Sequence, residues 1–210
     1  AVNIFNKAIQ LKPSYAMAHS NLGLALHDLG QLDAAVKSYE RALMIDPDYP
    51  EAQNNLGLTL HKLGQLDAAV KSYEKALAIN PGYAEAHNNL GNAFKELGQM
   101  DDAVKSYEKA LAINPDYDEV SYNLTIAYNN LGLAFMELGQ VDDAIKNYEK
   151  ALAINPDSSE ENNNLSIAYT YNGLGIANHS LDQLDAAVKC YKNALAIKPD
   201  YADSYANRGN

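Results

Sequence analysis

The chain has 210 residues, of which 47% are hydrophobic and 20% are charged, a composition that allows a substantial buried core. A formal net charge of −11 and the lack of a basic stripe argue against a nucleic-acid partner. No apolar run approaches the roughly 20 residues that span a bilayer, so no membrane partner is expected. The single cysteine, Cys190, excludes an intramolecular disulfide. Together with the lack of a visible signal peptide, it favours a reducing, cytoplasmic location.

A period of 34 residues runs through the chain. The string from Leu29 to Gly57 recurs almost unchanged from Leu63 to Gly91. With position 1 set at Ala16, glycine recurs at position 8, alanine at positions 20 and 27, and tyrosine at position 24. Proline recurs at position 32. Self-similarity at a fixed period of this length predicts a stack of repeated units.

Taken in chain order, the units begin with an incomplete one and end with another. We expect a single array over residues 1–210, in which each full unit supplies two helices. Its parts are a leading half-repeat (1–15), three regular repeats (16–49, 50–83 and 84–117), two longer repeats (118–158 and 159–201) and a trailing partial helix (202–210).

The spacing of apolar residues predicts two helices in each unit. The first carries apolar or small residues at positions 3, 7, 8, 10, 11 and 14, and glycine at position 15 ends it. The second follows the same kind of stripe until the proline at position 32 stops it. Small residues at positions 8, 20 and 27 let the two helices approach closely. One helix pair cannot bury its stripe alone, so the units must stack.

The two longer repeats carry extra residues inside their first helices. Seven extra residues preserve the face of a helix, so we predict one helix lengthened by two turns over about residues 118–138. Nine extra residues rotate the face by about 180°, which predicts a break near Asn172-Gly173. The alternative is an unbroken helix with a newly exposed face that would suit self-association. Asp182 replaces the glycine of position 15, so a less tight turn is expected there.

The small residues, the tyrosine at position 24 and the proline at position 32 agree in every full unit. In these residues the chain resembles the tetratricopeptide repeat family. The resemblance implies an all-α fold, a right-handed superhelical solenoid of antiparallel helix pairs. It also implies that the first helices line the concave face of the solenoid.

Asparagines recur at position 6 of the first helices, just outside the buried stripe. A ladder of amides there could bind the main chain of an extended peptide, or it could hydrogen-bond between repeats and fix their stacking. The pattern is similar to the repeat arm of the protein O-linked N-acetylglucosamine transferases, which holds acceptor polypeptides. Position 12 adds polar neighbours. The predicted peptide-binding residues are Asn21, Asn55, Asn89, Asn123, Asn130, Asn164, His27, His61 and Lys95.

No phosphate loop, catalytic triad, cofactor motif or metal-ligand cluster stands out in the sequence, and His27 and His61 are too far apart to share a zinc ion. Lysine and arginine are also absent from position 5, so binding of chaperone tails is not expected. The leading interpretation is a non-catalytic protein-protein interaction scaffold that binds a peptide or partner segment in its concave groove. The alternatives are the substrate-recruiting arm of a larger enzyme, such as a protein glycosyltransferase, and an engineered array of near-consensus units. The incomplete terminal repeats further suggest head-to-tail self-association.

Overall fold

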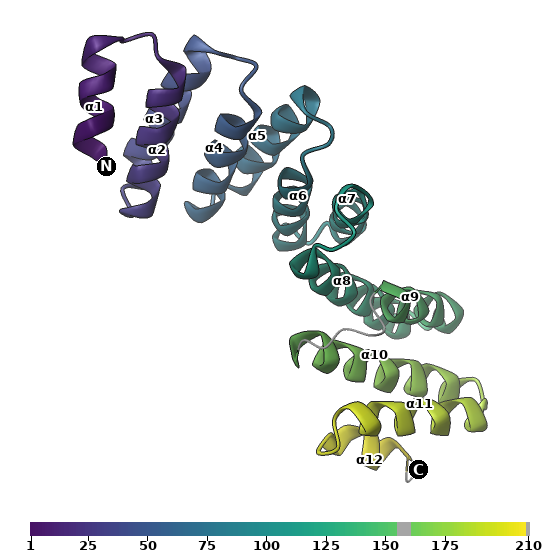
Figure 1. Cartoon of the computed structure of the whole chain (residues 1–210). Helices are drawn as coiled ribbons and strands as arrows, with labels where there is room; N and C mark the ends of the chain where they lie inside the picture. Colours follow the sequence, from purple (N-terminus) through teal and green to yellow (C-terminus); the bar gives the residue numbers. More distant parts are fainter. Residues whose placement is uncertain (155–160, 209–210) are drawn as a thin grey trace. The chain divides into compact units, whose positions relative to one another are not determined.

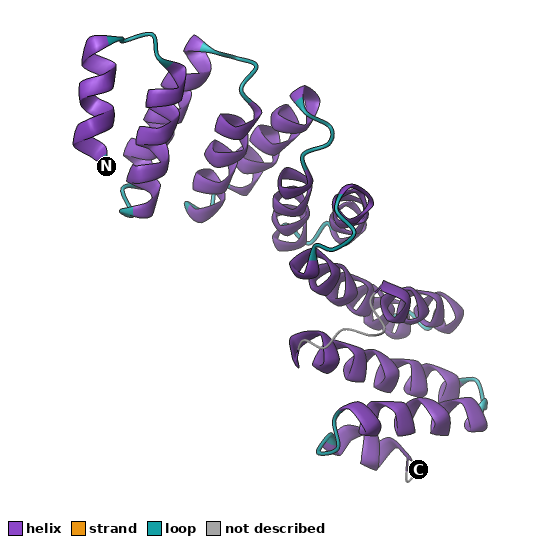
Figure 2. Ribbon diagram, in the orientation of Figure 1, coloured by secondary structure: helices purple, strands orange, loops and turns teal. Residues whose placement is uncertain are grey.

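The computed structural model describes residues 1–154 and 161–208, without the side chains of residues 161–165, 202 and 208 (Figure 1). Within the described residues the secondary structure is helical throughout, with short turns between the helices (Figure 2). Consecutive helices form antiparallel pairs, so the predicted all-α solenoid architecture is confirmed. The chain divides into two compact units, unit 1 (Ala1–Pro115) and unit 2 (Asp116–Asn210), and each is described by itself.

Unit 1 holds the leading half-repeat and the three regular repeats. Its first helices have 13 residues each and its second helices have 14, apart from the ten residues of the leading helix. The helices are α1 (Val2–Leu11), α2 (Ala16–Asp28), α3 (Leu32–Ile45), α4 (Pro50–Lys62), α5 (Leu66–Ile79), α6 (Ala84–Glu96) and α7 (Met100–Ile113).

The two helices of a repeat are held by a contact between glycine and tyrosine. A Cβ atom on Gly57 would approach Cε1 of Tyr73 to 2.6 Å, which leaves no room for a side chain. The alanines at positions 20 and 27, such as Ala69 and Ala76, are fully buried beside the same ring. The recurring small residues therefore mark the places where helices touch, as the repeat pattern predicted.

The turn between the two helices of a repeat uses a residue in the left-handed region. Gly64 has φ of 74°, and its amide donates to the carbonyl of His61 at 2.8 Å. Asp182 adopts the same conformation with φ of 57°, and its amide donates to the carbonyl of His179 at 3.1 Å. The expectation of a less tight turn at Asp182 is therefore wrong. An aspartate tolerates this region better than most residues, so the turn survives the substitution.

Unit 2 holds the two longer repeats. Its helices are α8 (Asp118–Glu137), α9 (Val141–Ile154), α10 (Glu161–Ser180), α11 (Leu184–Ile197) and α12 (Ala202–Arg208). The predicted lengthening of the first helix of the fourth repeat is confirmed, because α8 is a single helix of 20 residues. Tyr148 of α9 lies between two glycines, Gly132 of α8 and Gly173 of α10. The core of unit 2 thus keeps the same glycine-tyrosine contact as unit 1.

The helix break predicted near Asn172-Gly173 is wrong, because α10 is continuous through both residues. The predicted half-turn of rotation does not arise, because α10 has 20 residues, seven more than a regular first helix, and the other two extra residues precede it. Small side chains such as Ala168, Thr170 and Ala177 are fully buried, which allows neighbouring helices to pack closely from different sides. The hydrophobic residues that remain exposed on α10 are considered with the site below.

Candidate functional site

The sequence-predicted residues of unit 1 lie on the first helices α2, α4 and α6. The surface formed by Asn21, Leu24, Asn55, Leu58 and Asn89 is here called the first-helix face. Asn21, Asn55 and Asn89 are half-buried on this face. Leu24 and Leu58, one turn further along their helices, are exposed there. The face thus carries an amide and an aliphatic side chain on α2 and α4, whereas α6 has Asn92 in place of the leucine.

Part of the amide ladder links the repeats to each other. The side-chain amide of Asn89 donates to Oδ1 of Asn54 at 3.0 Å, from one first helix to the preceding one. Asn54 is fully buried, and its own amide points toward Glu85 Oε1 at 3.4 Å. Asn207 repeats the bond in unit 2, donating to Oδ1 of Asn172 at 3.1 Å. The asparagine pattern therefore has a structural role in stacking, which was one of the two interpretations of the sequence.

The asparagines of the longer repeats are in different surroundings. Asn123 is buried in α8, with an exposed fraction of 9%, so it is not available to a partner. Asn130 is exposed on the same helix, and it lines a pocket described below. The side chain of Asn164 lies outside the described residues. Of these three predicted contacts, Asn130 is the residue that the structure places on an accessible surface.

The predicted histidines also connect neighbouring repeats. His27 Nδ1 lies 2.9 Å from Oγ1 of Thr59, and His61 Nε2 lies 2.9 Å from Oε1 of Glu96. Burial, assisted by the nearby charge of Lys62, lowers the pKa of His27. Lys95 is half-buried at the position of His61 one repeat later. These side chains border the first-helix face, but both histidines already have partners within the protein.

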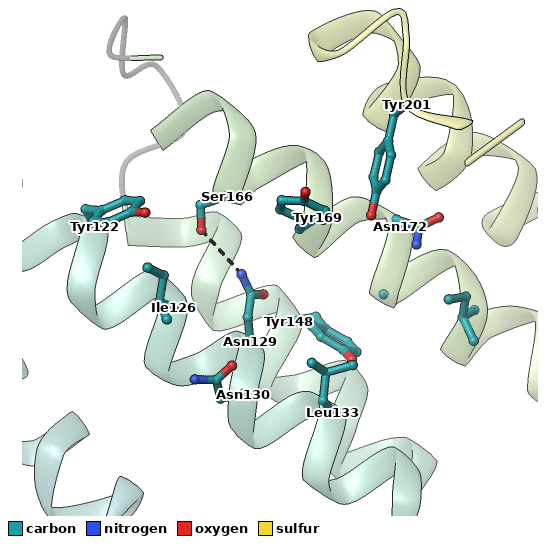
Figure 3. A pocket seen from close by; sticks show the side chains of 12 residues that line it. Tyr122, Ile126, Asn129, Asn130, Leu133, Tyr148, Ser166, Tyr169, Asn172 and Tyr201 are labelled. Atoms are coloured by element: carbon teal, nitrogen blue, oxygen red, sulfur yellow. Dashed lines mark hydrogen bonds between the residues drawn. The ribbon is translucent and has the colours of Figure 1, made fainter. Parts of the chain in front are cut away.

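A pocket in unit 2 was not foreseen from the sequence. It has a volume of about 360 Å³ and lies between α8 and α10 (Figure 3). Tyrosines and aliphatic side chains dominate its wall, and amides contribute the polar atoms. The lining residues are Tyr122, Ile126, Asn129, Asn130, Leu133, Tyr148, Ser166, Tyr169, Asn172, Gly173, Ile176 and Tyr201.

Hydrogen bonds across the pocket fix the two helices. The amide of Asn129 donates to Oγ of Ser166 at 3.4 Å, the bond drawn in Figure 3, and Oγ1 of Thr170 lies 2.7 Å from Oδ1 of Asn129. The rings of Tyr169 and Tyr201 meet edge to face with centroids 5.1 Å apart. The pocket wall is therefore preorganised by contacts within unit 2.

The pocket is electrically neutral. None of the described residues that line it is acidic, basic or a histidine. Burial raises the pKa of Tyr148 to about 12, and burial together with Asp203 raises the pKa of Tyr201 to about 12. Both hydroxyls are therefore uncharged near neutral pH. This chemistry suits an uncharged, largely apolar group.

Two observations bear on other kinds of site. Within the part of the chain that the structure describes, no group of three or more His, Cys, Asp or Glu side chains is placed to hold a metal ion. None of the described helices has the length and hydropathy that crossing a membrane requires.

Comparison with known protein families decides the classification. Models described as "TPR repeat" match residues 1–30, 23–64 and 59–98, and models described as "Tetratricopeptide repeat" match residues 84–117 and 123–200. The chain belongs to the tetratricopeptide repeat family. No curated protein sequence matches this tetratricopeptide repeat protein significantly.

Solved structures similar to this tetratricopeptide repeat protein share its architecture. YrrB, described as a TPR protein with an unusual peptide-binding site, superposes with a TM-score of 0.71 at 20% identity, over 100% of both chains. MamA gives a TM-score of 0.62 at 28% identity, over 89% of this chain and 93% of MamA. The first TPR of Spaghetti (RPAP3), bound to the HSP90 peptide SRMEEVD, gives 0.54 at 25% identity, over 55% of this chain and 92% of that domain.

Proposed function

We propose that this tetratricopeptide repeat protein is a non-catalytic scaffold that holds an extended segment of a partner protein on its first-helix face. The observation that carries the proposal is the recurrence of one surface. Three successive first helices of unit 1 present an asparagine at position 6, and two of them present an exposed leucine at position 9. Amides at regular spacing can donate to and accept from the main chain of an extended peptide.

The Spaghetti domain supports this kind of binding, because it is described in complex with a peptide. The chemistry of the bound segment should differ in this chain. Position 5 carries Ser20, Asn54 and Asn88 in unit 1, with no lysine or arginine to hold a terminal carboxylate. A net charge of −11 disfavours acidic segments. We therefore expect a neutral or basic segment held through its main chain.

The amides alone would give weak binding. The net contribution of one hydrogen bond is about 0.5–1.5 kcal/mol. One N–H of Asn89 already donates to Asn54 and is not available to a peptide. Several such bonds would sum to less than the roughly 8 kcal/mol of a micromolar complex. Affinity and selectivity must therefore come from side chains next to the ladder, such as Leu24 and Leu58.

A peptide-array screen tests the proposal. The parent is compared with the double variant Asn55→Ala plus Asn89→Ala, which should lose binding to most of the peptides retained by the parent. Asn54→Ala is the matched control, because it removes the same hydrogen bond between repeats but leaves both amides of the face in place. Equal binding by parent and double variant, or equal loss with Asn54→Ala, would remove the ladder from the mechanism.

A substrate-recruiting arm of a larger enzyme, such as a protein glycosyltransferase, would use the same face and the same amides. The sequence of the full-length gene discriminates the two roles, since the arm requires a catalytic domain in the same polypeptide. Head-to-tail self-association stays a separate prediction. A strict monomer in light scattering at high concentration would contradict it.

A further inference from the structure

The pocket of unit 2 arises from the departures from the 34-residue period. Tyr122, Ile126 and Leu133 stand 4 and 7 residues apart on α8, which places them on one face of that helix. Tyr169 and Ile176 stand 7 residues apart on α10 and line the same space. Both helices have 20 residues instead of 13. Leu133 and Ile176 stand at position 9, as Leu58 does in unit 1, whereas Tyr122 lies in the extra turns of α8 and has no counterpart there.

The missing side chain at Gly173 helps to open this space. Counted back from Gly175 at position 8, Gly173 occupies position 6, where α4 and α6 carry Asn55 and Asn89. A Cβ atom on Gly173 would approach Cζ of Tyr148 to 2.7 Å, so the tyrosine ring lies directly against it. An asparagine is therefore excluded at this position, and the amide ladder gives way to an aromatic wall.

The pocket exposes hydrophobic side chains to solvent. The exposed fractions are 55% for Leu133, 48% for Tyr169 and 39% for Ile176, and all three line the same cavity. Large apolar side chains gathered at one place, and edged by amides, are typical of a binding site rather than of a bare surface. Covering them with an apolar group is favourable at about 25 cal/mol per Å² of buried area.

Charge restricts what the pocket accepts. The Nζ of Lys198 lies 6.0 Å from the centre of the Tyr169 ring and 5.7 Å from that of Tyr201, so a cationic side chain would be repelled at this side of the pocket. An anionic group would be attracted by Lys198, but it would have to leave water for a wall that is itself uncharged. An uncharged group meets neither cost.

The size and polar atoms indicate an aromatic residue. A volume of about 360 Å³ lies at the low end of the range for ligand sites, about 300–1,000 Å³, and suits one bulky group. The polar atoms that Asn129, Asn130 and Asn172 contribute to the wall belong to uncharged amides. The buried hydroxyl of Tyr148 has no hydrogen-bond partner in the described protein, but neither has that of Tyr73 in unit 1, so it does not distinguish the pocket.

We infer that the pocket between α8 and α10 is a subsite for a single uncharged aromatic side chain of the partner segment. The inference rests on the proposed function, because it assumes that the partner is a peptide. The pocket would add the sequence selectivity that the amide ladder lacks. The ladder reads the main chain and tolerates any sequence, whereas the pocket selects one residue type.

The chain contains no tryptophan, so a tryptophan in a peptide can be observed without background. The probe is the capped pentapeptide acetyl-Gly-Ala-Trp-Ala-Gly-amide, titrated with the full chain while the emission maximum and anisotropy are recorded. We expect a blue shift and a rise in anisotropy. Unlabelled competitors with Phe in place of Trp should displace it, whereas competitors with Lys or Glu should be at least tenfold weaker.

Two matched substitutions locate the binding. Leu133→Asp places a charge in the pocket and should weaken binding at least tenfold. Leu184→Asp makes the same change on α11, at a leucine that does not line the pocket, and it should change binding less than twofold. Both leucines are 55% exposed, so neither substitution should unfold the chain. Circular dichroism and thermal melting verify the fold of each variant.

The outcomes separate the two proposals. No change in emission up to millimolar protein, or equal binding by the parent and Leu133→Asp, would overturn the pocket and leave the ladder to be judged by the array. Binding by the Lys or Glu peptide as strong as by the Trp peptide would also overturn it. Binding of N-acetyltryptophanamide as tight as that of the pentapeptide would overturn its role as a peptide subsite and indicate a small-molecule site instead.

Discussion

The ring of Tyr73 occupies the place that a side chain on Gly57 would need, since a Cβ atom there would lie 2.6 Å from Cε1 of the ring. The ring is fully buried, so it has little freedom to move away. The same pair recurs as Gly91 with Tyr107, at the same distance. The close approach of the two helices in each repeat therefore depends on this one pair.

The first prediction concerns this pair. Gly57→Ala should destabilise the protein, because overpacking a core costs about 1–3 kcal/mol, which exceeds the gain of about 0.8–1 kcal/mol from replacing glycine in a helix. Urea unfolding of Gly57→Ala, Tyr73→Leu and the double variant forms the test. If the clash is the cause, Gly57→Ala should cost less in the Tyr73→Leu background. Additive effects would show that the clash is relieved elsewhere.

The second prediction concerns the turn at Asp182. Its φ of 57° is one that residues with a side chain rarely adopt, and glycine fills this position in the other four turns between the paired helices. Asp182→Gly should stabilise the protein by about 1 kcal/mol, since the left-handed conformation costs a residue with a Cβ about that much. The melting temperature is the measurement. Asp185→Gly, inside α11, serves as the control and should destabilise.

The third prediction concerns acid. Burial lowers the pKa of His87 below the ordinary histidine value of 6.5, and the charge of Lys109 adds to the shift, although the hydrogen bond to the Pro81 carbonyl opposes it. The unfolded chain therefore takes up a proton on His87 before the folded chain does. Stability should fall as the pH drops below about 6.5, and the loss should be absent above it.

A substitution isolates this contribution. Gln53 occupies the position of His87 one repeat earlier and is also buried, so His87→Gln is compatible with the fold. Urea midpoints of the parent and of His87→Gln are measured between pH 5 and pH 8. The difference between them should be constant above pH 7, and below pH 6.5 the parent should lose stability relative to the variant. Parallel curves over the whole range would show that His87 does not titrate differently in the two states. Carboxylates affect both proteins equally and cancel in the difference.

The fourth prediction separates stacking from binding among the asparagines. Asn54 is fully buried and accepts the amide of Asn89, so Asn54→Ala should cost about 1–3 kcal/mol by leaving buried polar groups without partners. Asn55→Ala, one residue later on the half-buried face, should cost less than about 0.5 kcal/mol. Denaturant unfolding measures both. Equal losses would mean that Asn55 is also a structural residue.

Much of the fold follows from the repeat pattern. The glycine, alanine and tyrosine positions mark the helix contacts, and the seven-residue insertion of α8 preserves its face, so its length could be predicted. The break in α10 was predicted from rotation alone. That prediction assigned all nine extra residues to the helix. Only seven of them lengthen α10, as in α8, and the other two lie between α9 and α10, so the phase of the helix is preserved without a break.

The site could be predicted less well than the fold. The helical spacing predicts Asn55 and Asn89 just outside the buried stripe, and both are half-buried. The bond from Asn89 to Asn54 joins two repeats, so the sequence of either repeat alone does not indicate it. The pocket was missed for the same reason. Tyr122 lies in the extra turns of α8 and Tyr169 at position 2 of the next repeat, and their common wall exists only after both helices are packed.

The insertions of α8 and α10 both precede the glycine of their own repeat. Gly132 still meets Tyr148, and Gly175 still meets Tyr191, so the stacking contacts downstream are unchanged. Extra turns of helix can thus be added upstream of that glycine without changes to the core residues of the repeat. During evolution such arrays could gain new pockets by lengthening one helix at a time. The partners that they bind could then change while the packing between helices stays constant.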